Sequence, residues 1–316
     1  MGGFVRTLTG DLPPDALGAT LIHEHLSVDW GEMLGRPKKL DFDRAEMADL
    51  MVAKLTDLAA AGIGAMTECT PYGCGRYVDL FAEVARRSPV RIIGSTGFFH
   101  ESWCPIHPVA AALDLDALTD LITREITEGM GDTLIRAGLI KVATGQGRIS
   151  ANEEKVLRAA ARARRATGCP IITHITDSMS EDQLDVFASE GVGADEVVIS
   201  HVGFTADPFA ESEALFRRGA NVSFDRIGYK VFFADDHWIA LIANAKAKGY
   251  LGQVLLSHDA ATFSYGLEMA SGENLWDDYT YISRVFLPRL RAEAGITEED
   301  ISQMLVTNPQ RVLAFG

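Results

Sequence analysis

The stretch AGLIKVATGQGRISANEEKVLRAAARARRATGCPIITHIT, residues 137–176, contains one complete strand–helix–strand repeat. Two short apolar runs, Leu139–Thr144 and Ile171–Ile175, have the length and composition of buried parallel strands. Between them, Asn152–Thr167 has a helical pattern that a glycine and Pro170 bring to an end. The segment therefore predicts two parallel strands joined by a helix.

The same alternation of strand and helix continues along the whole chain. Short apolar runs bounded by turn residues predict eight strands, at Thr20–Leu26, Ile63–Thr70, Val90–Thr96, Leu139–Thr144, Ile171–Ile175, Val197–Val202, Asn221–Asp225 and Val254–His258. The runs recur about every 34 residues, which fits a strand, a helix and two short loops. The strand count and even spacing predict a single-domain α/β fold over residues 1–316, a (β/α)8 TIM barrel, with an open, doubly wound sheet as the alternative.

Helix boundaries are also marked in the sequence. Ala45–Ala61 and Phe233–Lys248 are each followed by a glycine. Ser180 is expected to cap the helix Ser180–Glu190, and Thr297 is expected to open the last helix with a capping box.

The composition excludes several classes of protein. Lys and Arg number 29 against 44 Asp and Glu, and the net charge of −15 argues against nucleic-acid or membrane-surface binding. The start, MGGFVRTLTG, lacks the regions of a secretory signal, and no apolar run approaches the ~18 residues of a membrane helix. The four cysteines, Cys69, Cys74, Cys104 and Cys169, form no CxxC pair. We expect a reduced, cytoplasmic protein that acts on a small molecule.

Several side chains able to bind metal lie at or near the ends of the predicted strands. These residues are His23, His25, Lys141, His174, His201 and Asp259. His23 and His25 are two apart on a strand and so share a face, and TIM-barrel active sites lie at the carboxyl ends of the strands. A lone strand histidine is more often a packed residue than a ligand. Four histidines and an aspartate spread over four strands nevertheless predict a metal site.

Lys141 has three interpretations. An amine is a poor metal ligand, and burying its charge without a partner costs several kcal/mol. Lys141 could form a salt bridge, act as a Schiff-base nucleophile, or react with CO₂ to give a carbamate that bridges two cations. Spacing alone does not choose among them.

At this point the sequence resembles the phosphotriesterase family of the amidohydrolase superfamily, in particular its lactonase-like branch. The motifs LIHEHL, AGLIKVATG, PIITHIT, ISHVG, NVSFDRIG and VLLSHDA occur in the family's order, and VTNPQRVLAF near the carboxyl end also fits. The resemblance covers His23 through Asp259 and is highly specific.

The resemblance implies a centre of two divalent metal ions. His23, His25 and Asp259 would hold the buried ion, His174 and His201 the more exposed ion, and N6-carboxylated Lys141 would bridge them together with a hydroxide. Zinc suits these ligands, and cobalt, manganese or iron is also compatible. The hydroxide would attack the electrophilic carbon or phosphorus, and Asp259 would take its proton. The family often forms dimers, so the resemblance also implies a homodimer.

The expected substrate is a lactone or related carboxyl ester, with weak phosphotriesterase side activity. Arg226 matches the Asp-Arg pair of lactonase-like members and could orient a lactone carbonyl or bind a substrate carboxylate; alternatively, it pairs with a neighbouring carboxylate. Phe99 stands where these members commonly have tyrosine, which removes a hydroxyl near the metals. His100 could replace that hydroxyl, although a surface position in a loop is the expectation.

Loops at the same end of the barrel are expected to form the substrate pocket. Ala260–Asp278, with Phe263 and Trp276, is predicted to be a loop that covers an apolar pocket. Ile227–His237 would form another wall, and Tyr72 lies beyond the second strand near the same rim. Ordinary packing of these aromatic residues on the barrel is the alternative.

Three other functions are compatible with part of this pattern. The same centre could cleave an amide or a carbamate. A metal-free lyase would use Lys141 as a Schiff base, which borohydride would trap. A non-catalytic barrel that serves as a binding module would tolerate changes at Lys141 or Asp259.

Overall fold

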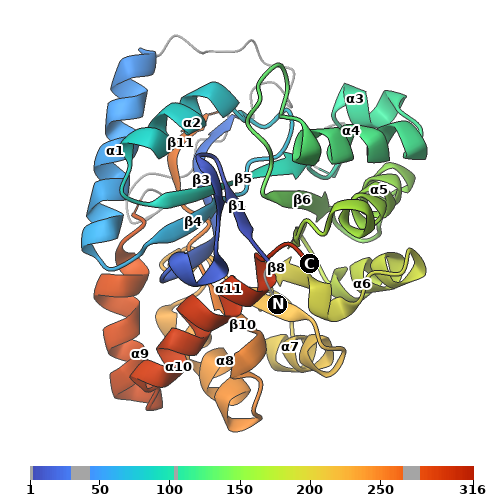
Figure 1. Ribbon diagram of the computed structural model, residues 1–316. Helices are drawn as coiled ribbons and strands as arrows, with labels where there is room; N and C mark the ends of the chain where they lie inside the picture. The colour runs from blue at the N-terminus through green and yellow to red at the C-terminus, as the bar shows by residue number, and fades with distance from the viewer. Residues whose placement is uncertain (1–2, 30–42, 103–105, 266–277) are drawn as a thin grey trace.

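The computed structural model describes residues 3–29, 43–102, 106–265 and 278–316 (Figure 1). Parallel strands form one curled sheet in the order β10-β9-β8-β7-β6-β5-β4-β3-β11. Their bounds are β3 Thr20–Asp29, β4 Ala65–Glu68, β5 Arg91–Gly97, β6 Leu139–Thr144, β7 Ile171–Ile175, β8 Val197–Ser200, β9 Asn221–Phe224, β10 Val254–Leu256 and β11 Ala261–Tyr265. The eight predicted strands are therefore present in the predicted order.

The sheet closes between β10 and β3. The Asp259 N–H donates to the His23 carbonyl at 3.0 Å, and the His25 N–H donates to the Ala260 carbonyl at 2.8 Å. The chain then continues as β11, which pairs in parallel with β3 and places Phe263 opposite Ser27. This closed ring confirms the TIM barrel and excludes the open, doubly wound sheet.

β11 also corrects one expectation, because Ala261–Tyr265 was predicted to begin a loop over the pocket. These residues form a strand because the outer edge of β3 offers them unpaired backbone groups. Residues 266–277 of the predicted loop lie outside the described residues.

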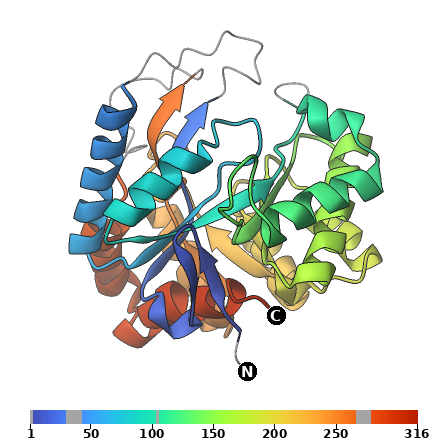
Figure 2. The ribbon, with the colours of Figure 1, turned by 45° about the horizontal axis from the view of Figure 1, so that its top comes forward.

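Helices surround the sheet on its outer face, apart from α11, which lies at the end of the barrel where the strands start (Figures 1 and 2). The helices are α1 Arg44–Ala60, α2 Val78–Arg87, α3 Pro108–Ala112, α4 Leu115–Thr127, α5 Ala151–Thr167, α6 Ser180–Ser189, α7 Pro208–Arg217, α8 Asp235–Ala247, α9 Leu287–Ala294, α10 Glu298–Ser302 and α11 Asn308–Val312. A large apolar cluster fills the space between the sheet and these helices.

Most predicted helix ends lie within one residue of those in the structure, but the helix predicted from Phe233 begins two residues later, at Asp235. Thr297 caps α10 in a capping box with Asp300, as predicted. The prediction that Ser180 caps α6 is wrong, because Met179 occupies the cap position without a side-chain bond. The Ser180 hydroxyl donates instead to the Glu211 carboxylate on α7, at 3.4 Å.

A second, smaller apolar cluster fills the barrel near the start of its strands. It contains Ile22, Ala65, Ile93, Leu139, Ile172, Val198 and Leu255, each from a different strand. Val5, from the hairpin of β1 (Val5–Thr7) and β2 (Gly10–Leu12), packs with Leu17 and Leu313 against this cluster. Both termini lie at this end, opposite the tips of β3 and β11 (Figure 2). With this end filled by apolar side chains, polar groups gather at the carboxyl ends of the strands.

Cys69, Cys74 and Cys169 are free and buried, and Cys104 lies outside the described residues. Within the described ranges, every helix is too short or too polar to cross a membrane.

Candidate metal centre

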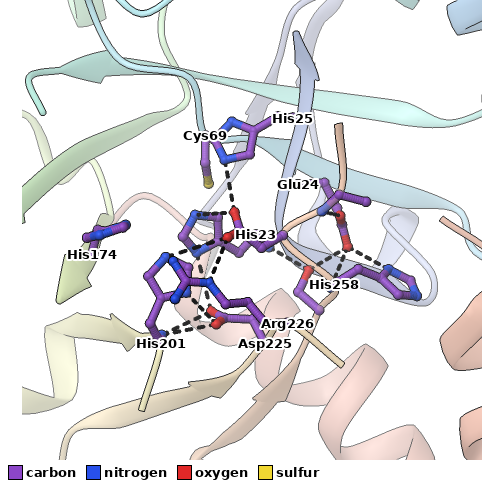
Figure 3. A network of polar contacts seen from close by, with 12 residues as sticks. His23, Glu24, His25, Cys69, His174, His201, Asp225, Arg226 and His258 are labelled. Carbon is purple, nitrogen blue, oxygen red and sulfur yellow. Dashed lines mark hydrogen bonds and ion pairs between the residues drawn. The ribbon is translucent and has the colours of Figure 1, made fainter. Parts of the chain in front are cut away.

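Three predicted ligands meet at one buried point beyond the barrel's apolar cluster (Figure 3). His23 comes from β3, His201 directly follows β8, and Asp259 lies after β10. One ligand atom from each lies within 4.8 Å of the other two. His23 Nε2 is 3.6 Å from Asp259 Oδ1, and His201 Nε2 is 3.9 Å from Asp259 Oδ2.

The other three predicted residues adjoin this point. His25 Nε2 lies 3.2 Å from Asp259 Oδ1. The ring centroid of His174 is 4.3 Å from that of His201. Lys141 Nζ is 2.9 Å from the Nε2 atom of His23. The fold therefore brings together all six residues that the sequence singled out.

Backbone strain is concentrated at this site. His201, Arg226 and Asp259 have φ angles of 63°, 62° and 62°, and they are the only non-glycine residues with positive φ among those described. Each lies within three residues of the end of β8, β9 or β10. A left-handed conformation costs roughly 1–2 kcal/mol for an L-residue and is retained mainly where function requires it. Here it places the His201 and Asp259 side chains at the same point.

Asp225, which the sequence analysis did not single out, orients two of the histidines. Its carboxylate accepts the backbone N–H of His201 at 3.1 and 3.2 Å and lies 2.6 Å from His201 Nδ1. The same carboxylate is 3.3 Å from His23 Nδ1. Burial alone would raise the pKa of Asp225, but the two imidazoles outweigh burial and hold that pKa below its usual range. Because Nδ1 of each ring faces Asp225, Nε2 of each ring faces the site.

Glu24, also missed, fixes the segment that carries Asp259. It is fully buried and accepts hydrogen bonds from the Ser257 hydroxyl at 2.8 Å and from the N–H groups of His258 and Ala260 at 2.8 and 2.7 Å. His258 Nδ1 also lies 2.8 Å from Glu24. The only signal in the sequence is its place between two strand histidines, where alternation points it to the opposite face.

The donor set fits a divalent metal ion. His201 Nε2 is buried and has no hydrogen-bond partner in the described part of the chain, which leaves a lone pair facing Asp259. Burial, together with Lys141, lowers the pKa of His23 to about 3, and burial also lowers the pKa of His174 and His201. Neutral imidazoles beside a carboxylate are the ligands that zinc and similar ions prefer.

Lys141 is buried without an acidic partner. Its Nζ contacts His23 and the Thr173 carbonyl, the latter at 3.3 Å, and no carboxylate of the described residues lies within ion-pair distance. Burial lowers the pKa of Lys141. The salt-bridge interpretation thus finds no partner among these residues, whereas a neutral amine is the form that reacts with CO₂ or a carbonyl.

Arg226 reaches the cluster from the loop after β9. Its Nε donates to Asp259 Oδ2 at 3.1 Å. Its Cζ lies 5.1 Å from the ring centroid of Phe204 and 5.3 Å from that of Phe232. Arg226 therefore does pair with a neighbouring carboxylate, and that carboxylate belongs to the candidate centre.

Phe99 and His100 lie beside His174. The Phe99 ring meets the His174 ring edge-on at 5.0 Å. The expectation of a surface position for His100 is wrong: it is fully buried, 5.3 Å from the His174 ring. Its Nδ1 accepts the Ser102 N–H at 3.2 Å, and its ring centroid lies 4.1 Å from that of Phe99, so the ring is packed away from solvent.

The remaining predicted pocket residues are Tyr72, Phe263 and Trp276. The Tyr72 ring packs against Phe98 and His107, with centroids 5.4 and 4.9 Å apart. Phe263 lies on β11, beside β3, and Trp276 lies outside the described residues.

Comparisons with known proteins agree with this architecture. The model of the phosphotriesterase family matches residues 3–313. A phosphotriesterase homology protein of Mycobacterium tuberculosis is 31% identical over 98% of this chain and 97% of its own length. A phospho-furanose lactonase of Mycoplasmopsis synoviae is 28% identical over 99% and 92%, respectively. A mutant of the PTE-like lactonase from Deinococcus radiodurans has a TM-score of 0.89 and 32% identity, covering 99% of this chain and 100% of that chain.

Proposed function

The chain belongs to the phosphotriesterase family of metal-dependent hydrolases, and we propose that it hydrolyses a lactone or a related carboxyl ester. The observation that carries the proposal is the convergence of His23, His201 and Asp259 at one buried point, with two of them on strained backbone. Two similar proteins, from M. synoviae and D. radiodurans, are named as lactonases. Weak hydrolysis of phosphotriesters is part of the proposal.

We propose that the centre holds two divalent ions, with zinc the best match to its ligands. His23, His25 and Asp259 would hold one ion, His174 and His201 the other, and carboxylated Lys141 would bridge them. Such a pair lowers the pKa of a shared water and polarises the substrate oxygen. Carboxylation needs an unprotonated amine, and burial of Lys141 without an acidic partner favours that form.

Asp259 is proposed as the proton acceptor. Its carboxylate lies at the centre of the cluster, near His23, His25 and His201. The hydrogen bond from Arg226 Nε and the Glu24 contacts around residues 257–260 hold it in place. Asp259 would take the proton released when water attacks the substrate and would pass it to the leaving group or to solvent.

Elemental analysis together with a hydrolysis panel tests the proposal. The panel contains lactones, aryl esters, carbamates and phosphotriesters. We expect about two transition-metal ions per chain and the fastest turnover on lactones. No metal after reconstitution with bicarbonate and divalent ions would contradict the proposed centre. Two ions with turnover only on amides or carbamates would contradict the proposed substrate.

The variant Asp259→Asn should stay folded and lose nearly all turnover. Asp235→Asn is a matched control, because Asp235 is also buried but bonds Tyr281 and Arg289. Near-normal kcat in Asp259→Asn would remove Asp259 from its proposed role.

A further inference from the structure

Arg226 presents unused hydrogen-bond donors at the candidate centre. Its side chain is 16% exposed, against 1% for His23 and His201 and 7% for Asp259. Only its Nε is engaged, by Asp259. Within the part of the chain that the structure describes, Nη1 and Nη2 donate no hydrogen bond. The guanidinium therefore has two N–H-bearing nitrogens available to a bound molecule.

Aromatic rings hold this guanidinium in position. Phe204 and Phe232 lie near its Cζ, and Phe204 packs in turn against Phe233 and Trp238 at centroid distances of 5.3 and 5.5 Å. Trp238 is fully buried on α8, which anchors the stack to the barrel. Together with the bond to Asp259, these contacts restrict the side chain. An arginine ordered before binding loses less conformational entropy when it binds a ligand.

This arrangement matches an anion with two oxygens. A guanidinium binds a carboxylate or a phosphate through two parallel N–H···O bonds, which a single carbonyl oxygen cannot provide. The chain's net charge of −15 would disfavour an anionic ligand unless a local cation compensated it. Arg226 supplies that cation at the more exposed side of the cluster, whereas Lys141 is only 1% exposed.

We propose that the substrate carries an anionic group, a carboxylate or a phosphate, and that Arg226 Nη1 and Nη2 bind it. This inference rests on the proposed function, since it adds a charged substituent to the lactone or ester. The aromatic pair Phe204 and Phe232 positions Arg226 for this contact.

The test compares three lactones of the same ring size: one neutral, one bearing a carboxylate and one bearing a phosphate ester. The ratio of kcat/KM for an anionic lactone to that for the neutral one is measured, because general damage to the site affects both substrates. We expect a ratio above about ten in the unaltered protein. In Arg226→Gln the ratio should fall about 10- to 100-fold, mainly through KM. The larger ratio identifies whether carboxylate or phosphate is preferred.

Two further variants separate the effect of removing any positive charge from the effect of changing Arg226 or the ring beside it. Arg218→Gln removes the same charge from a surface arginine that pairs with Asp185, and its ratio should equal that of the unaltered protein. Phe232→Ala removes a 43% exposed ring from the guanidinium and should lower the ratio by a smaller factor than Arg226→Gln. A ratio near one in the unaltered protein, or an unchanged ratio in Arg226→Gln, would overturn the inference.

A binding measurement at equilibrium tests the anion site without requiring turnover. Calorimetry would follow binding of the carboxylate- and phosphate-bearing hydroxy acids, which are the products of hydrolysis. If the affinity for either acid falls at least tenfold in Arg226→Gln, the anion site is supported. This holds even if no lactone is hydrolysed, because the absence of lactone hydrolysis would contradict only the proposed function. Failure of both acids to bind, or equal affinity in the two proteins, would refute the anion site.

Discussion

Replacing Asp225 by asparagine should weaken metal binding without unfolding the barrel. The side chain keeps its shape but loses its charge and one of its two acceptor oxygens. The native carboxylate contacts the His201 N–H, His201 Nδ1 and His23 Nδ1, at distances between 2.6 and 3.3 Å. An amide places an NH₂ group against one of these nitrogens, where two donors then face each other.

The expected size of the effect follows from these contacts. A hydrogen bond to a charged group contributes about 1.5–3 kcal/mol and a neutral one about 0.5–1.5 kcal/mol. In Asp225→Asn, one hydrogen bond to the histidines is weakened and another is lost. The total loss of free energy should be about 2–4 kcal/mol, divided between the stability of the fold and the affinity for metal. Loss of a group that orients metal-ligating histidines typically lowers metal affinity 10- to 100-fold, so we expect a change in that range.

Competition with a chelator would measure affinity, and thermal unfolding of the metal-free protein would measure stability. Asp235→Asn is the control, because it removes a buried carboxylate that bonds Tyr281 and Arg289. It should lower stability and leave metal affinity unchanged. Wild-type affinity in Asp225→Asn, or an equal loss of affinity in both variants, would refute the reasoning.

Three other changes test separate parts of the molecule. Lys141→Ala should lose metal and turnover and regain part of both with a short carboxylic acid; retained metal with no rescue would rule out a bridging carbamate. Phe99→Tyr adds a hydroxyl on a ring that meets His174 edge-on and should raise kcat/KM for lactones relative to aryl esters, whereas an unchanged ratio would show that this position does not contact the reacting oxygen. Thr297→Ala removes the cap of α10 and should lower the free energy of unfolding by about 1 kcal/mol, as measured by denaturant titration, with turnover unchanged. A stability loss below about 0.3 kcal/mol would mean that this cap contributes little.

The features that the sequence analysis missed share a physical cause. β11 is a strand because β3 lies beside it, although the two segments are far apart in the chain. Glu24 bonds residues 257–260, and Asp225 bonds His201 and His23, so neither role is visible in local spacing. Ser180 has the composition of a cap, but its hydroxyl lies near Glu211 on the next helix.

The sequence by itself determined the order of strands and helices and the six clustered residues. Apolar runs and turn residues are local signals, and parallel strands of one barrel must end at the same rim, so residues at those ends converge. Only the tertiary structure decided how the cluster is held: Asp225 against two imidazoles, Arg226 beside two aromatic rings that pack on each other, and His100 buried beside His174. These contacts join segments that are distant in the chain, and their geometry exists only after the barrel has closed.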